Sequence, residues 1–236
     1  MRERGAMARQ KTAELKPVSD EAPEQYVPSW QRDSVDRSLR NAIERARKRS
    51  DRFVEAAVEL LSERDEGDFS IQDVVDRSGQ SQRTFYTFFD SKDSLMLAVY
   101  ETILRKTAMP MLQERCEGID DPVLRLRALL DALSEITEMP ARLARGLSVL
   151  HLRLAETRPN DLASALEPLH AFIVELLNAV AKAGRLREDL GLHTQAALLQ
   201  ELLLASTHSR VLTGGSQTSV DDLWAFCSAA ILRRED

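Results

Sequence analysis

Apolar residues recur at helical spacing along most of the chain after residue 34, and no segment of useful length alternates with the period of a strand. In the first helical run the apolar residues on one face are Val35, Leu39, Ile43 and Ala46. In the second run they are Phe53, Ala57, Leu60 and Leu61. These two runs fit either one long helix or two helices that meet near Arg49. The pattern predicts an all-α protein.

Two short helices joined by a tight turn are predicted between residues 69 and 89. Ser70 and Asp73 have the spacing of a capping box, which satisfies the free amides at a helix start. Gly79 can adopt the left-handed conformation that ends a helix, and Ser81 is a good cap for the next one. Two short helices around a glycine-containing turn form a helix-turn-helix arrangement.

The second of these helices has one apolar face and several polar side chains elsewhere. Phe85 and Phe89 lie four residues apart, so they share a face and are predicted to enter the core. The other faces hold Gln82, Arg83, Tyr86 and Thr87. A helix that reads the major groove needs outward hydrogen-bonding side chains of this kind.

The run Thr84-Phe85-Tyr86-x-x-Phe89-x-Ser91-Lys92-Asp93-x-Leu95 resembles the TetR family of bacterial transcription regulators. The resemblance extends from about residue 53 to 100. It departs at Gln80, where the family usually has a small apolar residue, and at Phe88, where a His or Tyr is frequent. The resemblance implies an N-terminal three-helix helix-turn-helix domain, followed by a larger helical bundle for ligand binding and dimerisation. The last two helices would form most of the dimer interface.

Candidate DNA contacts follow from these residues and their neighbours. They are Ser70, Ser81, Gln82, Arg83, Thr84, Tyr86, Lys92, Arg47, Lys48 and Arg49. Arg83 could pair with guanine or bind phosphate. Tyr86 and Lys92 match family positions that contact the DNA backbone, whereas Ser70 could bind phosphate through its amide or act only as a cap. Because the formal net charge is −6, the DNA-binding face must be local.

Proline, glycine and capping residues divide the remainder into further helices. Expected starts are Ser91, Asp121-Pro122, Pro140, Asn160, His193 and Ser219, and expected ends are near Met139, Arg158, Gly184 and Gly214. Pro168 predicts a kink or break in its helix. We expect a flexible arm over residues 1–33, the DNA-binding domain over 34–96 and the bundle over 97–236.

Composition and motifs exclude several other classes. The chain contains 43% hydrophobic and 30% charged residues, shows no signal peptide, and has its most apolar run at residues 196–205, too short to span a membrane. Cys116 and Cys227 are expected to be buried free thiols in a cytoplasmic protein. No catalytic motif, metal-ligand spacing or cofactor site is visible.

The bundle is expected to hold a cavity of a few hundred cubic ångströms, lined by apolar residues with a few polar ones. Candidate ligand contacts are Ile103, Leu104, Leu147, Leu150, His151, His170, Ile173 and Thr207. We therefore expect a repressor that binds a palindromic operator in double-stranded DNA as a homodimer and is released by a hydrophobic or amphipathic small molecule. Two alternatives are a DNA-binding regulator without a ligand and a helical enzyme that keeps the motif only for packing.

Overall fold

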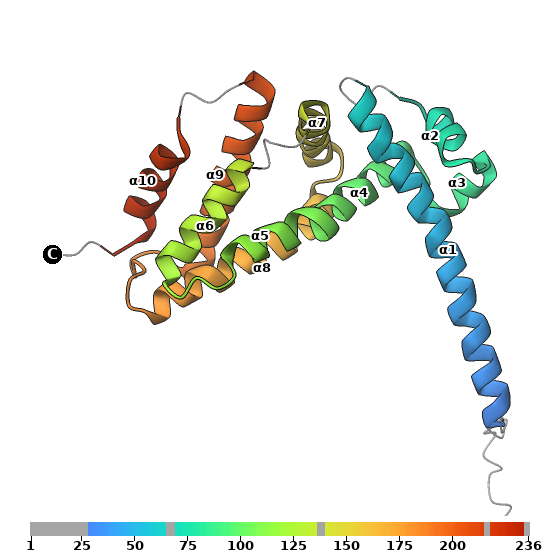
Figure 1. Cartoon of the computed structure of the whole chain (residues 1–236), viewed down its shortest axis with the longest axis horizontal. Helices are drawn as coiled ribbons and strands as arrows, with labels where there is room; N and C mark the ends of the chain where they lie inside the picture. The colour runs from blue at the N-terminus through green and yellow to red at the C-terminus, as the bar shows by residue number, and fades with distance from the viewer. Residues whose placement is uncertain (1–27, 65–68, 136–139, 215–217, 234–236) are drawn as a thin grey trace, which may run out of the picture. The chain divides into compact units, whose positions relative to one another are not determined.

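The computed structural model describes residues 28–64, 69–135, 140–214 and 218–233 (Figure 1). The helices are α1 (Ser29–Glu63), α2 (Ile71–Ser78), α3 (Gln82–Phe88), α4 (Lys92–Ile103), the π-helical segment η2 (Leu104–Ala108), α5 (Met109–Cys116), α6 (Pro122–Glu135), α7 (Ala141–Thr157), α8 (Pro159–Lys182), α9 (Leu192–Thr213) and α10 (Val220–Ile231). Within the described ranges the only β contact is an isolated bridge between Leu186 and Leu232. The all-α prediction is confirmed.

The chain divides into two compact units, residues 1–44 and 45–236, and every contact described below lies in the second unit. Helix α1 is one continuous helix across the boundary, so the two-helix alternative is wrong. It follows directly on Pro28 and begins five residues before the expected start at Ser34. Most of the arm expected over residues 1–33 lies outside the described residues.

The caps predicted around the turn are confirmed. The Ser70 hydroxyl accepts from the Asp73 amide at 3.2 Å, and the Asp73 carboxylate accepts from the Ser70 amide at 2.7 Å. Gly79 ends α2 with a φ of 66°, a conformation that costs little only for glycine. Ser81 caps α3 by accepting from the Thr84 amide at 3.1 Å.

Three phenylalanines hold the first helices together. Phe85 and Phe89 are buried as predicted, and both rings meet the ring of Phe53 on α1 edge to face, at centroid distances of 5.4 and 6.2 Å. Such pairs each contribute about 0.5–1.5 kcal/mol beyond the burial of their area. This cluster fixes the position of α3 against α1, so that the opposite side of α3 remains exposed.

Helix α4 starts at the predicted cap Ser91 and continues through η2 into α5. In η2 the Met109 amide donates to the carbonyl of Leu104, five residues back. The next residue is Pro110, which has no amide hydrogen to donate. The sequence pattern predicted a helix here but not the wider π turn, which is frequent at functional sites.

Helix α8 forms the centre of the bundle, with nine buried residues over its length. It is unbroken at Pro168, so the expected break is absent; the buried neighbours Leu166 and Leu169 hold both sides of the proline in place. By length and composition α8 could also cross a membrane, although 44% of its apolar window is buried in the fold. The sequence expectation overlooked α8 when it named residues 196–205 as the most apolar run.

The boundaries expected at Gly184, Gly214 and Ser219 agree with the structure, whereas the helix end expected near Met139 lies outside the described residues. Left-handed glycines follow α8 and α9 at Gly184 and Gly214, and a Ser219 capping box opens α10. Cys116 and Cys227 are buried free thiols, as predicted. Burial raises the pKa of Cys227 to about 11, so its reactive thiolate form is disfavoured at neutral pH.

Candidate functional site

The outer side of α3 presents polar side chains on a rigid support. Gln82 and Arg83 are exposed in its first turn, and Tyr86 is 54% exposed one turn later. The Tyr86 ring stands edge-on against buried Phe85, at 5.3 Å between centroids. Because the inner face of α3 is anchored by aromatic packing, these three outward side chains start from a fixed backbone position.

The hydroxyl groups of α3 are used partly within the helix. The Ser81 and Thr84 hydroxyls share a hydrogen bond of 2.8 Å, and the Thr87 hydroxyl donates to the Arg83 carbonyl at 3.0 Å. A base contact from Ser81 or Thr84 would therefore have to be compatible with the cap. The side chains of Gln82 and Arg83 take no part in this cap, so a base contact from either of them would not have to be compatible with it.

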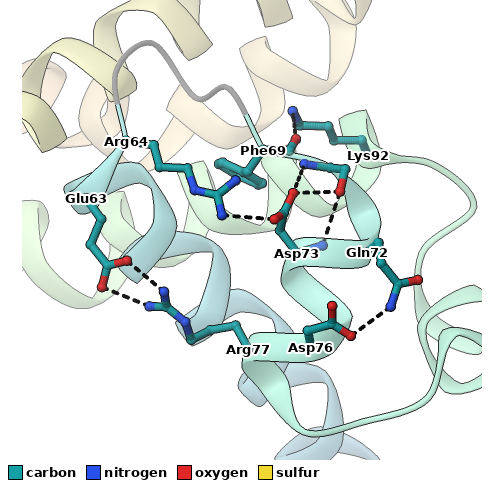
Figure 2. A network of polar contacts seen from close by, with 9 residues as sticks. Glu63, Arg64, Phe69, Gln72, Asp73, Asp76, Arg77 and Lys92 are labelled. Carbon is teal, nitrogen blue, oxygen red and sulfur yellow. Dashed lines mark hydrogen bonds and ion pairs between the residues drawn. The ribbon is translucent and has the colours of Figure 1, made fainter.

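Ser70 and Lys92 are both engaged with neighbouring groups. The Ser70 amide, which was expected to hold a phosphate, donates to the Asp73 carboxylate. Lys92 donates to the Phe69 carbonyl and lies 4.4 Å above the centroid of the Phe69 ring (Figure 2). Their proposed DNA contacts stay predictions. The capping role of Ser70 was predicted from the sequence, whereas the contact of Lys92 with Phe69 was not.

An ion-pair network joins α2 to the end of α1 (Figure 2). Arg77 pairs with Glu63 at 2.7 Å and with Glu59 at 3.1 Å, while Arg64 pairs with Asp73 at 2.9 Å. Hydrogen bonds from Ser70 and Arg64 hold the pKa of the Asp73 carboxyl well below its usual range. The network fixes the orientation of α2, which in turn supports the turn before α3.

The basic residues expected near the DNA lie on α1 beside this turn. Arg47, Lys48 and Arg49 are exposed, and Arg47 makes only a loose pair with Asp51, at 3.9 Å. Gln80 donates to the Arg49 carbonyl at 2.6 Å. This bond gives a reason for the polar residue at the position where the family usually has a small apolar one.

The bundle holds a partly open cavity of about 160 Å³, smaller than expected from the sequence. Its walls come from α4, η2, α5, α6, α7, α8 and α9, and they are apolar except for a few groups: Tyr100, Thr107, Ser148, Thr207 and His208. Segment η2 contributes Leu104, Thr107 and Ala108 to the wall. The π turn therefore shapes one side of the cavity.

The expected ligand contacts fall in four places; one of them, His151, does not line the cavity but contacts the lining residues Tyr100 and His208. Ile103, Leu104, Leu147 and Thr207 line the cavity. Leu150 and Ile173 are buried in the core and do not line it. His170 lies apart, in a separate hollow where its ring is 3.1 Å from the Gln200 amide oxygen. Their ligand contacts stay predictions.

A polar cluster stands at one wall of the cavity. The Tyr100 hydroxyl is 2.8 Å from His151 Nδ1, and the His151 ring lies 4.4 Å from the ring of His208, centroid to centroid. Burial lowers the pKa of His151 to about 4 and also lowers that of His208. Sequence reasoning missed Tyr100 and His208, because three helices bring these residues together from positions far apart in the chain.

Helix α7 touches both the cavity and the helix-turn-helix. Gly146 packs on Leu61 of α1 so closely that an added Cβ would lie 3.0 Å from Leu61 Cδ2. Arg142 donates to the Glu63 carbonyl at 2.8 Å, and Arg153 pairs with Asp93 at the start of α4 at 2.9 Å. Helix α7 therefore connects the cavity wall to α1 and α4.

Comparison with known proteins agrees with this arrangement. Residues 53–99 match the family of bacterial regulatory proteins of the tetR type. Over 88 residues the chain is 35% identical to an uncharacterised helix-turn-helix transcriptional regulator, YvdT of Bacillus subtilis, a match that spans 37% of this chain and 45% of that protein. The chain thus matches less than half the length of this relative.

Two solved structures share the fold beyond the helix-turn-helix. RolR in complex with resorcinol has a TM-score of 0.63 at 16% identity, over 80% of this chain and 90% of RolR. FadR of Bacillus subtilis in complex with stearoyl-CoA has a TM-score of 0.60 at 13% identity, over 75% of this chain and 95% of FadR. Residues 53–99 thus carry the helix-turn-helix of the TetR family of transcription regulators, and the chain as a whole shares the fold of these solved structures.

Proposed function

We propose that the protein is a ligand-responsive repressor that binds a palindromic operator as a homodimer. The observation that carries this proposal is the exposed polar side of α3, where Gln82, Arg83 and Tyr86 stand on a backbone held by buried aromatic rings. In this proposal Arg83 reads a base and Tyr86 positions the protein on the DNA backbone. Such a regulator would act in the cytoplasm.

The ligand response is supported by the cavity and by α7. The cavity is almost entirely apolar with few polar groups, which is the usual character of a small-molecule site. Helix α7 lines the cavity and also contacts the end of α1, so two arrangements of α7 could favour different positions of α3. A ligand that binds one arrangement better would shift the population and thereby lower DNA affinity.

The neighbouring structures hold ligands of very different size. RolR is described with resorcinol and FadR with stearoyl-CoA. A cavity of about 160 Å³ fits the smaller of the two far better. We therefore propose a small hydrophobic or amphipathic effector. The presence of the cavity favours this function over a regulator without a ligand, and the similarity to regulators favours it over an enzyme.

The homodimer is supported by apolar residues exposed on the last two helices. Leu198 of α9 is 53% exposed and Phe226 of α10 is 66% exposed, so a partner subunit that packed on these two helices would bury both side chains. Two copies would place two α3 helices in successive major grooves, about 34–36 Å apart. Sedimentation of the wild type should give a dimer, whereas Leu198→Glu should shift the protein towards monomer.

Selection from a random pool of double-stranded DNA tests the proposed function directly. The protein should enrich one palindromic sequence whose half-sites are centred about one helical turn apart. Neutralising Arg47, Lys48 and Arg49 should then reduce the slope of log affinity against log salt concentration. The reduction should be about 0.9 for each phosphate contact that is lost. Recovery of unrelated sequences with uniform affinity would contradict sequence-specific regulation.

A further inference from the structure

The polar groups in the cavity wall allow the ligand class to be narrowed. The cavity holds about 160 Å³, and apolar cavities of about 150 Å³ in proteins take up benzene-sized molecules. The apolar part of the ligand is therefore about one six-membered ring. Longer chains or fused rings would have to extend through the open side of the cavity or displace its wall.

His208 has a hydrogen-bonding capacity that the protein does not use. Its ring lines the cavity, and among the described residues no group forms a hydrogen bond with either of its nitrogens. A neutral imidazole carries one donor and one acceptor. A pure hydrocarbon in the cavity would cover these atoms without giving them a partner, which is costly in an apolar site.

Tyr100 and His151 extend this polar site from the other side. Both Tyr100 and His208 line the cavity, with His151 in contact with each of them. The Tyr100 hydroxyl can donate to His151 and still accept a hydrogen bond, or accept from His151 and donate to a ligand. The cluster can thus both donate to and accept from one hydroxyl group.

The charges around the cluster favour an uncharged ligand. Burial keeps the imidazoles of His151 and His208 in their neutral form and raises the pKa of Tyr100, so none of the three supplies a charge at neutral pH. The nearest cation on α9 is Arg210, which lines a small adjoining hollow with Thr207 rather than the cavity itself. A carboxylate in the cavity would have to take up a proton or draw Arg210 inward.

We infer that the cavity takes a small, uncharged phenol, that Tyr100 and His208 bind its hydroxyl group, and that His151 orients these two side chains from behind the cavity wall. The inference rests on the proposed function, because it takes this cavity as the effector site. A phenol hydroxyl is a good donor, remains neutral near pH 7 as tyrosine does, and carries a ring of the right size. The hydroxyl would lie against His208 and Tyr100, with the ring among Leu104, Leu147 and Leu204.

Calorimetric titration of the free protein with phenol, toluene and benzoate tests the inference. Phenol should bind at least about tenfold more tightly than toluene, which lacks the hydroxyl, and more tightly than benzoate, which is charged. The affinity for phenol should be unchanged between pH 7 and 8, and the ultraviolet spectrum of bound phenol should remain that of the neutral form. Tighter binding of benzoate, equal binding of toluene, or no binding of phenol would each overturn it.

Two variants assign the effect to the cluster. His208→Phe keeps an aromatic ring but removes both nitrogens, and it should lower phenol affinity about tenfold while leaving toluene affinity unchanged or higher. Tyr100→Phe removes one hydroxyl and should act in the same direction. His193→Phe is the matched control, since His193 is an exposed histidine of α9 that does not line the cavity, and it should change phenol binding little. Melting temperatures establish that each variant is folded, and an unchanged preference for phenol in both folded cluster variants would refute the assignment.

The phenol site and the proposed function can be tested separately, because either one can fail while the other holds. If phenol binds with the expected preference but leaves operator affinity unchanged, the ligand response fails while the binding site stands. If the protein binds a specific operator and another molecule releases it while phenol does not bind, the regulator stands and the phenol site is wrong.

Discussion

Replacing Ala144 by leucine provides a quantitative test of whether the cavity is empty space. Ala144 is buried in α7 and its side chain forms part of the cavity wall. Leucine adds three carbon atoms, and each newly buried methylene group contributes about 0.8 kcal/mol. If the cavity accepts the larger side chain, the free energy of unfolding should rise by up to about 2.4 kcal/mol. The same change in a filled core typically costs about 1–3 kcal/mol, so the two cases differ in sign.

Ala165→Leu is the matched control. Ala165 is also a buried alanine in a helix, but it lines neither this cavity nor the hollow around His170. It should lose about 1–3 kcal/mol through overpacking. Urea denaturation of both variants and the wild type, at one protein concentration, gives the comparison. If Ala144→Leu is destabilised as strongly as Ala165→Leu, the cavity cannot accommodate a ligand without rearrangement and the reasoning about it is wrong.

Three further predictions concern other parts of the molecule. Arg83→Ala should weaken binding to the selected operator by about 1–3 kcal/mol and binding to random duplex by less; equal losses in gel-shift titrations would make Arg83 a phosphate contact. Phe85→Ala should lower the free energy of unfolding by about 3–5 kcal/mol in urea, and a loss below about 1 kcal/mol would contradict its role as the anchor of α3. His151 has a pKa of about 4 in the fold against an ordinary 6.5, so the unfolded chain binds the proton first and stability should fall as pH drops from about 6.5 to 4. In His151→Phe that decline should be smaller, as judged by denaturation at each pH.

Local signals explain why so much of the fold was predictable from the sequence. Ser70, Gly79 and Ser81 act on amides and carbonyls within a few residues of themselves, so their spacing alone identifies the ends of α2 and α3. The pair Phe85 and Phe89 likewise indicates a buried face through its spacing of four. These features depend on no distant part of the chain.

The cavity could be predicted only in outline, because its composition depends on packing between distant helices. Tyr100, His151 and His208 belong to α4, α7 and α9, and nothing in the local sequence of any one of them indicates the other two. For the same reason periodicity could not distinguish Leu150, which faces the core, from Leu147, which lines the cavity one turn earlier. The π turn at η2 could not be predicted from the sequence either, since its residues have ordinary helical character.

The central claim is that occupation of the cavity and binding of operator DNA oppose each other. The most direct test measures the affinity of one ligand twice, with free protein and with protein saturated by the selected operator. The ligand should be the compound, from a panel of small aromatic and aliphatic molecules, that most raises the melting temperature. Because coupling between two sites is reciprocal, we predict that saturation with operator weakens ligand binding about 5–150-fold, and that the ligand weakens operator binding by the same factor. Equal ligand affinity with and without operator would contradict the claim.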